Sequence, residues 1–117
     1  MTTASKIDRD TLIQAFREAA AAALAADPGE GLENDGGTCN FDTPAVFLPG
    51  ARERFVEECA AAAGISASAF RWLGGRRWFF VFVPLKGQAN RRSRMAEAGC
   101  RRLKELGLDA VMYCQAD

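Results

Sequence analysis

The segment from Lys86 to Arg94, with the sequence KGQANRRSR, holds the residue types best suited to binding an anion. Its three arginines, Arg91, Arg92 and Arg94, fall at the start of a helix that apolar spacing predicts from about Asn90 to Leu106. The positive end of a helix dipole disfavours cations, so this placement is locally costly. A bound phosphate would offset the cost, because it gains from exposed backbone N–H groups and planar guanidinium donors.

The direction of Arg92 supports a pocket at this helix start. On an ideal helix it projects within about 20° of the buried stripe through Gly99 and Leu103. Two other interpretations stay open. The three arginines could form a solvated surface run or pair with the acidic first half of the chain, and Gln88 and Asn90 could be helix caps.

A second group of candidates is the aromatic hairpin FRWLGGRRWFF, residues 70 to 80. Arginines interleaved with aromatic rings can stack on nucleobases, which makes Phe70, Trp72 and Trp78 candidate base contacts. The strand also resembles slightly the aromatic strand of RNA-recognition domains, although Arg77 and Phe79 replace the expected small residues. Burial in a core or in a subunit interface is the competing interpretation.

A third candidate is the segment GGTCNFD, residues 36 to 42. Strand alternation would turn Cys39 and Phe41 inward and leave Asn40 and Asp42 on the opposite face, where they could bind the hydroxyls of a ligand. Because Gly, Asn and Asp favour turns, a turn with a bulge is equally consistent with the sequence.

Composition argues against catalysis. The chain has no histidine, which excludes Ser-His-Asp and Cys-His mechanisms and imidazole metal ligands. The four cysteines lack the paired spacing of zinc sites, and we expect free thiols. Cys59, Cys100 and Cys114 are predicted to be small core residues, whereas Cys39 could be reactive. We therefore expect no enzyme, no cofactor and no metal.

Charge is unevenly distributed along the chain. The 15 basic and 15 acidic residues cancel, yet residues 1 to 50 carry a net charge of −5 and residues 71 to 104 a net charge of +9. This asymmetry favours an anionic partner or an oligomer in which unlike faces meet. No apolar run reaches the roughly 18 residues of a membrane span, and the amino terminus lacks the features of a signal peptide. The sequence thus predicts a cytoplasmic protein.

Apolar periodicity and turn residues predict a single α+β domain over residues 1–117, with an antiparallel-rich, five-stranded sheet and three helices. We expect an N-terminal helix within 1–27, a mobile acidic loop at 28–37, and the sheet with two helices in 38–117. The predicted strands are 38–42, 45–48, 70–73, 77–83 and 108–114, and the later helices run from 49 to 63 and from 90 to 106. From Ala45 onward the order is the split βαβ plan of ferredoxin-like folds, preceded by an added helix and hairpin strand. The strand from Arg77 to Val83 is apolar on both sides, so its second face needs the first helix or another subunit, unless it is a stacking platform.

Three blocks of the sequence resemble a known family. They are GTCNFD at residues 37 to 42, GQANRRSRMAEA at residues 87 to 98, and YCQAD at residues 113 to 117. They look like blocks of small phage and prophage proteins, and among these the chain resembles the Thoeris anti-defence sponge proteins. The resemblance covers the chain from about residue 36 onward and includes no motif of the first helix.

The resemblance implies sequestration without catalysis. Sponges of this family trap cyclic ADP-ribose isomers made by bacterial TIR enzymes, and some members trap cyclic oligonucleotides of CBASS defence as hexamers. It implies that Arg92 and Arg94 hold the pyrophosphate with Asn90 and Gln88 beside them. It also implies that the protein acts in the cytoplasm of an infected bacterium. Such messengers offer phosphates to guanidinium groups, hydroxyls to Asn and Asp, and adenine to aromatic rings.

Other functions stay open at this point. The basic segment from 71 to 104 is also consistent with a module that binds RNA or single-stranded nucleic acid, whose affinity would fall steeply with salt. An inhibitor that docks its acidic or aromatic face on a host enzyme is a third class. An enzyme that uses Cys39 or Asp42 has the least support, since no base or metal motif accompanies them.

Overall fold

Three helices and a four-stranded antiparallel sheet make up the computed structural model, which describes residues 7–29, 40–87 and 89–116. The predicted α+β class is therefore confirmed. The elements in chain order are α1 (Arg9–Ala25), β1 (Asn40–Phe47), α3 (Glu53–Ala62), β2 (Ser66–Trp72), β3 (Arg76–Phe82), α4 (Ala89–Glu105) and β4 (Asp109–Ala116). No helix within the described ranges is long and apolar enough to cross a membrane.

The sheet has the strand order β2-β3-β1-β4, and each neighbouring pair is antiparallel. The prediction of five strands is wrong for the described residues. Instead of two short strands joined by a turn at Asp42 to Pro44, one continuous strand, β1, runs from Asn40 to Phe47. Thr38 and the predicted acidic loop from residue 30 onward lie outside the described residues.

Pro44 stays within β1 because the strand is paired on only one side there. β1 pairs with β3 at Ala45 and Val46, whereas it pairs with β4 along its whole length. From Pro44 towards Asn40, the β3 side is thus an edge, where a residue without an N–H is tolerated. The hydroxyl of the neighbouring Thr43 donates to the backbone carbonyl of Val81 at 3.2 Å, in place of a ladder bond.

Local signals at the ends of the helices are confirmed. The Asp8 side chain accepts from the backbone N–H of Thr11 at 2.7 Å and caps α1. Gly107, with a φ of 90°, follows α4 as the predicted stop. Gly74 and Gly75 have φ values of 74° and 75°, the left-handed backbone that the predicted turn between β2 and β3 requires.

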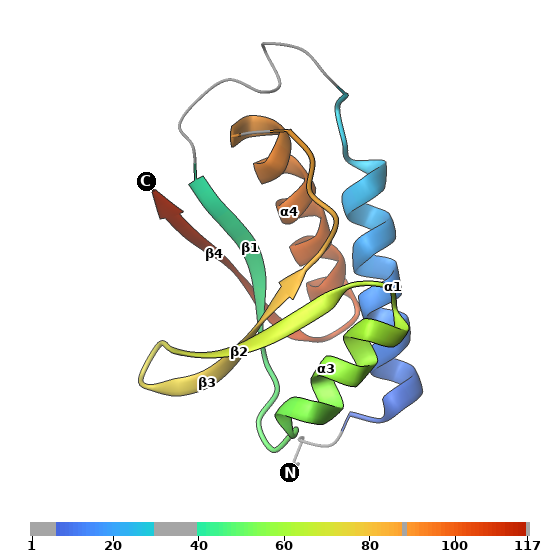
Figure 1. Ribbon diagram of the computed structural model, residues 1–117, viewed down its shortest axis with the longest axis vertical. Coiled ribbons are helices and arrows are strands. Elements are labelled where there is room, and N and C mark those ends of the chain that lie inside the picture. The colour runs from blue at the N-terminus through green and yellow to red at the C-terminus, as the bar shows by residue number, and fades with distance from the viewer. Residues whose placement is uncertain (1–6, 30–39, 88, 117) are drawn as a thin grey trace.

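All three helices lie on the same side of the sheet (Figure 1). One continuous cluster joins them to the inward residues of β1 and β3, and its largest fully buried members are Phe16, Phe79, Leu12, Met95, Leu103, Val46, Val56 and Val81. α4 packs on β1 and β4, and α3 packs on β2, while α1 packs against both of these helices. α1 does not cover the second face of the sheet, which was one of the predicted arrangements.

α1 and α4 approach closely at Gly99. A Cβ atom built there would lie 3.1 Å from Cγ1 of Val83 and 3.4 Å from the backbone oxygen of Ala19 on α1. The alanines that face this contact, including Ala15 and Ala23, are buried. The part of α1 around Ala19 therefore carries small side chains, because the backbone of α1 lies close to α4 there.

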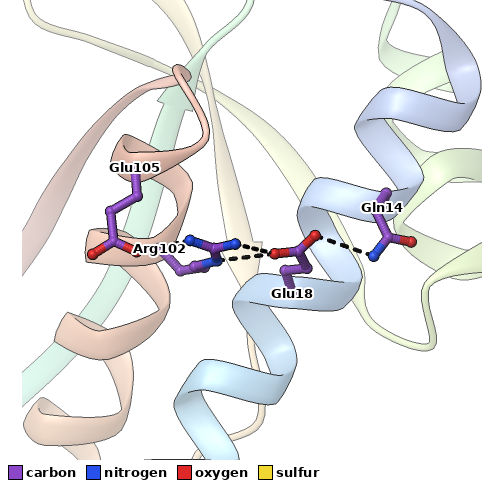
Figure 2. A network of polar contacts seen from close by, with 4 residues as sticks. All are labelled: Gln14, Glu18, Arg102 and Glu105. Carbon is purple, nitrogen blue, oxygen red and sulfur yellow. Dashed lines mark hydrogen bonds and ion pairs between the residues drawn. The ribbon is translucent and has the colours of Figure 1, made fainter.

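A polar network ties the same two helices together at the surface (Figure 2). Nε of Arg102 on α4 donates to Oε1 of Glu18 on α1 at 3.0 Å, and Nη2 donates to the same oxygen. Arg102 also bonds Glu105 at 2.9 Å, and the side chain of Gln14 donates to Glu18 at 3.1 Å. The bond from Arg102, followed by that from Gln14, lowers the pKa of Glu18.

Replacing Gly99 with valine should destabilise the protein by about 1–3 kcal/mol, because the added side chain must push Val83 and α1 away from α4. The measurement is the free energy of unfolding in urea. The matched control is Ala21→Val at an exposed position of α1, where we expect a cost below about 0.7 kcal/mol from helix propensity alone. Equal costs for the two variants would contradict a tight contact at Gly99.

Candidate functional site

The first of the three clustered arginines has a partner inside the chain. Nε of Arg91 donates to Oδ1 of Asp27 at 2.7 Å and Nη2 donates to Oδ2 at 3.0 Å, a bidentate pair with side chains only 11% and 15% exposed. The backbone N–H of Gly29 donates to the same carboxylate at 2.9 Å. The Arg91 guanidinium first and the Gly29 N–H second lower the pKa of Asp27 to about 2. The predicted pairing with the acidic half of the chain thus holds for Arg91.

The other two arginines remain available. Arg92 is half-buried and Arg94 is exposed, and neither makes a hydrogen bond or ion pair with any residue that the structure describes. Asn90 is exposed and is the second residue of α4 instead of its cap. Gln88 lies outside the described residues. We call Asn90, Arg92 and Arg94 the cationic helix start.

Asp42 lies on the opposite side of β1 from the one expected for a ligand-binding residue. It is 3% exposed, faces the helices, and accepts a hydrogen bond from the Ser93 hydroxyl in the first turns of α4. Its other oxygen, Oδ1, is buried without a hydrogen-bond partner among the described residues. Asp42 shares its face of β1 with the core residue Val46, four positions along the strand, and Ser93 supplies a hydrogen bond there, so the predicted alternation had the wrong phase. Asn40 begins β1 opposite Ala116, and its backbone is all that is described.

The face of the sheet away from the helices is aromatic. Register places on this face alternate residues of every strand, and the aromatic ones whose side chains are described are Phe47, Phe70, Trp72, Trp78, Phe80, Phe82 and Tyr113. Trp78 is buried, and the other six are half-buried. We call this surface the aromatic sheet face. It holds the three predicted base contacts, Phe70, Trp72 and Trp78.

The rings of this face pack mainly on one another. Phe70 stacks on Phe80 with centroids 3.7 Å apart and planes 5° apart. Tyr113 packs edge-on against Phe70, Phe80 and Trp72 at 5.1–5.5 Å. Trp78 lies 5.2 Å from Trp72, and its indole Nε1 is buried without a partner among the described residues. The result is a continuous aromatic layer across the sheet.

The cationic helix start and the aromatic sheet face lie on opposite sides of the sheet. α4 packs on the helix side of β1 and β4, whereas Phe70, Trp72 and Trp78 project from the other side. The predicted arginine and aromatic ligands are therefore not brought together within one chain. A single small ligand could contact both groups only if two copies contributed.

Catalytic chemistry finds little support in the described residues. No group of three or more His, Cys, Asp or Glu side chains there could hold a metal ion. Burial raises the pKa of the Cys59 and Cys100 thiols, which are core residues as predicted. Cys114 is exposed, contrary to prediction, and partial desolvation followed by the neighbouring Asp42 carboxylate raises the pKa of its thiol. These three thiols are therefore poor nucleophiles at neutral pH.

Sequence reasoning missed several residues of these surfaces. Asp27 is not among the candidates from the sequence, because no local pattern connects it with Arg91, 64 positions away. Tyr113 and Phe47 were not singled out, although alternation along β1 and β4 places them on the face of Trp78. The signal for those two was present in the strand periodicity.

Comparison with protein-family models, curated proteins and solved structures finds no match to this chain.

Replacing Asp27 with asparagine should flatten the loss of stability on acidification. Because the folded-state pKa is about 2, below the ordinary value, the charged carboxylate stabilises the fold above about pH 4, and this contribution is lost as pH falls towards 2. Urea unfolding measured at several pH values down to 2 should show a smaller change for Asp27→Asn than for the unmodified protein. Glu57→Gln is the control, at an exposed carboxylate of α3 without an ion pair among the described residues, and equal slopes for Asp27→Asn and the control would contradict the assignment.

Proposed function

We propose that this protein binds and sequesters a cyclic nucleotide messenger without converting it, as a phage anti-defence sponge. The ligand class is a cyclic ADP-ribose isomer, with cyclic oligonucleotides as a related class. The observation that carries the proposal is that Arg92 and Arg94, in the first turns of α4, have no anionic partner among the described residues while neighbouring Arg91 does. The three sequence blocks that resemble the sponge family point to the same segment.

The electrostatics of the helix start favour a phosphate ligand. Asp27 compensates Arg91 at the positive end of α4, and no described residue forms an ion pair with Arg92 or Arg94. A pyrophosphate would supply two negative charges and acceptor oxygens that match the planar donors of arginine. The amide of Asn90 is exposed and has donors and an acceptor that a ribose hydroxyl could use. This combination recognises the shared chemistry of cyclic nucleotides more than one particular molecule.

Binding without turnover agrees with the residues present. The chain has no histidine, and the described cysteines have raised thiol pKa values. A site made of arginines and amides can hold a phosphodiester but offers neither a general base nor a nucleophile. We expect the bound messenger to be recovered intact.

Assembly into a homo-oligomer, a hexamer by the resemblance, belongs to the same proposal. It is supported by the separation of Arg92 from the aromatic sheet face, because further contacts to the base of the ligand would then have to come from a second copy. Action in the cytoplasm of an infected bacterium follows from this role. We also propose the ferredoxin-like plan for residues 40 to 116, supported by the strand order β2-β3-β1-β4 with a helix after β1 and after β3.

The double variant Arg92→Ala/Arg94→Ala should lose affinity for cyclic ADP-ribose isomers. Hydrogen bonds to charged groups contribute about 1.5–3 kcal/mol each, so the dissociation constant should rise about a hundredfold or more. Isothermal titration calorimetry measures the affinity, and chromatography after denaturation shows whether the ligand is intact.

The matched control is Arg101→Ala/Lys104→Ala, which removes the same charge from exposed positions nearer the end of α4. The control should bind within a few fold of the unmodified protein. Equal affinities for the two double variants would sink the proposal, and so would recovery of a hydrolysed ligand.

A further inference from the structure

We propose that the aromatic sheet face is the surface through which two copies of this chain associate. The assignment stands on the sheet alone and does not rest on the ligand proposed above. It commits to one occupant, a second copy of the chain, packed sheet against sheet.

The face is apolar and has no cover within the described chain. All three helices pack on the other side, and the buried core cluster contains none of the seven aromatic residues of this face. Six of those side chains are half-buried, so each keeps part of its apolar surface in contact with water among the described residues. Burying contiguous apolar area of this kind is the main favourable term in association, and sheets of two chains pack well at about 10 Å separation.

Charge on the face favours a second copy over a nucleic acid. Among the described strand residues on this side, the charged ones are Arg76 on β3 and Asp109 on β4, one of each sign. A platform for single-stranded nucleic acid needs cations in excess to neutralise phosphates. A face with one cation and one anion can instead complement itself when two copies meet by two-fold symmetry.

The arginines that flank the aromatic residues in sequence serve the other side. Arg77 donates to the backbone oxygen of Ala51 and lies 3.6 Å from the Glu53 carboxylate of α3. Arg71 donates to the backbone oxygen of Gly75 at 2.9 Å. The interleaved pattern that suggested base stacking therefore separates in space, with aromatic rings on one face and these two arginines on the other.

Ring geometry gives an independent argument. Phe70 and Phe80 stack face to face on each other, and Tyr113 presents its edge to both. Ring faces engaged in this way are not free to sandwich a nucleobase. The parts of these rings that stay exposed suit apolar packing against another protein surface. Obligate interfaces of this kind resemble a domain core cut in half.

The test inserts a charge of either sign at Ser68, an exposed residue of β2 that lies on this face opposite Phe80. Ser68→Glu and Ser68→Arg should both weaken self-association, because in a two-fold contact each charge appears twice and is desolvated. Sedimentation velocity over a range of concentrations should give a dissociation constant raised about tenfold or more in both variants. Ala21→Glu and Ala21→Arg, at an exposed position of α1, should associate like the unmodified protein.

A second measurement separates the competing occupant. Fluorescence polarisation measures the affinity of each variant for a labelled single-stranded oligouridine. We expect the affinities of Ser68→Arg and Ser68→Glu to be the same as that of the unmodified protein. If Ser68→Arg bound the oligonucleotide more tightly and Ser68→Glu more weakly, the face would be a nucleic-acid platform and the proposal would be overturned. A monomeric unmodified protein, or association unchanged by both Ser68 variants, would overturn it as well.

The outcome is distinguishable from that of the proposed function. Arg92→Ala/Arg94→Ala alters the helix side of the sheet, so it should retain self-association whether or not the protein binds a cyclic nucleotide. Circular dichroism of the Ser68 variants should match the unmodified protein, because Ser68 is exposed on an edge strand and contributes nothing to the buried core cluster.

Discussion

The close packing of α1 against α4 is the constraint on which the rest of this structure depends. It requires alanines along α1 and no side chain at Gly99, where a Cβ atom would lie 3.4 Å from a backbone oxygen of α1. With its small residues committed to this contact, α1 lies in the same layer as the other helices. The opposite face of the sheet is then left without a cover in the described chain. Its aromatic residues pack on one another and are not part of the core cluster.

The same contact decides which of the clustered arginines is paired with a carboxylate inside the described chain. α1 ends beside the start of α4, so Asp27 reaches Arg91 and forms a bidentate pair that is largely shielded from water. The pairing of Arg91 with Asp27 lowers the electrostatic cost of three arginines at the start of α4. The segment stays positively charged, because no described residue forms an ion pair with Arg92 or Arg94. Arg91, which stabilises the fold, is therefore adjacent in sequence to arginines that have no anionic partner among the described residues.

Local signals in the sequence were sufficient for the presence of the helices and for the glycine turn, because each depends on residues within one turn of one another. They put the start of α3 too early, at residue 49 instead of Glu53, where no side chain caps the helix. The α+β class followed from the order of those elements. The continuous strand β1 was not predictable, since Pro44 normally interrupts a strand and only pairing limited to β4 makes it acceptable there. The inward turn of Asp42 depends on Ser93, and the neutralisation of Arg91 depends on Asp27, each a partner from a distant part of the chain. Contacts of that kind leave no trace in periodicity, which reports only how a segment divides between water and core.

Pro44 also protects the alignment of the sheet against error. If the register of β1 relative to β3 shifted by one residue, Pro44, which has no N–H, would be paired with a residue of β3 that needs a hydrogen-bond donor. The same slip would turn Val46 out of the core and expose it on the side of Phe80, so two penalties would coincide. The pyrrolidine ring of Pro44 therefore disfavours the shifted alignment and helps to keep the aromatic layer in register, although Pro44 lies on the other side of the sheet.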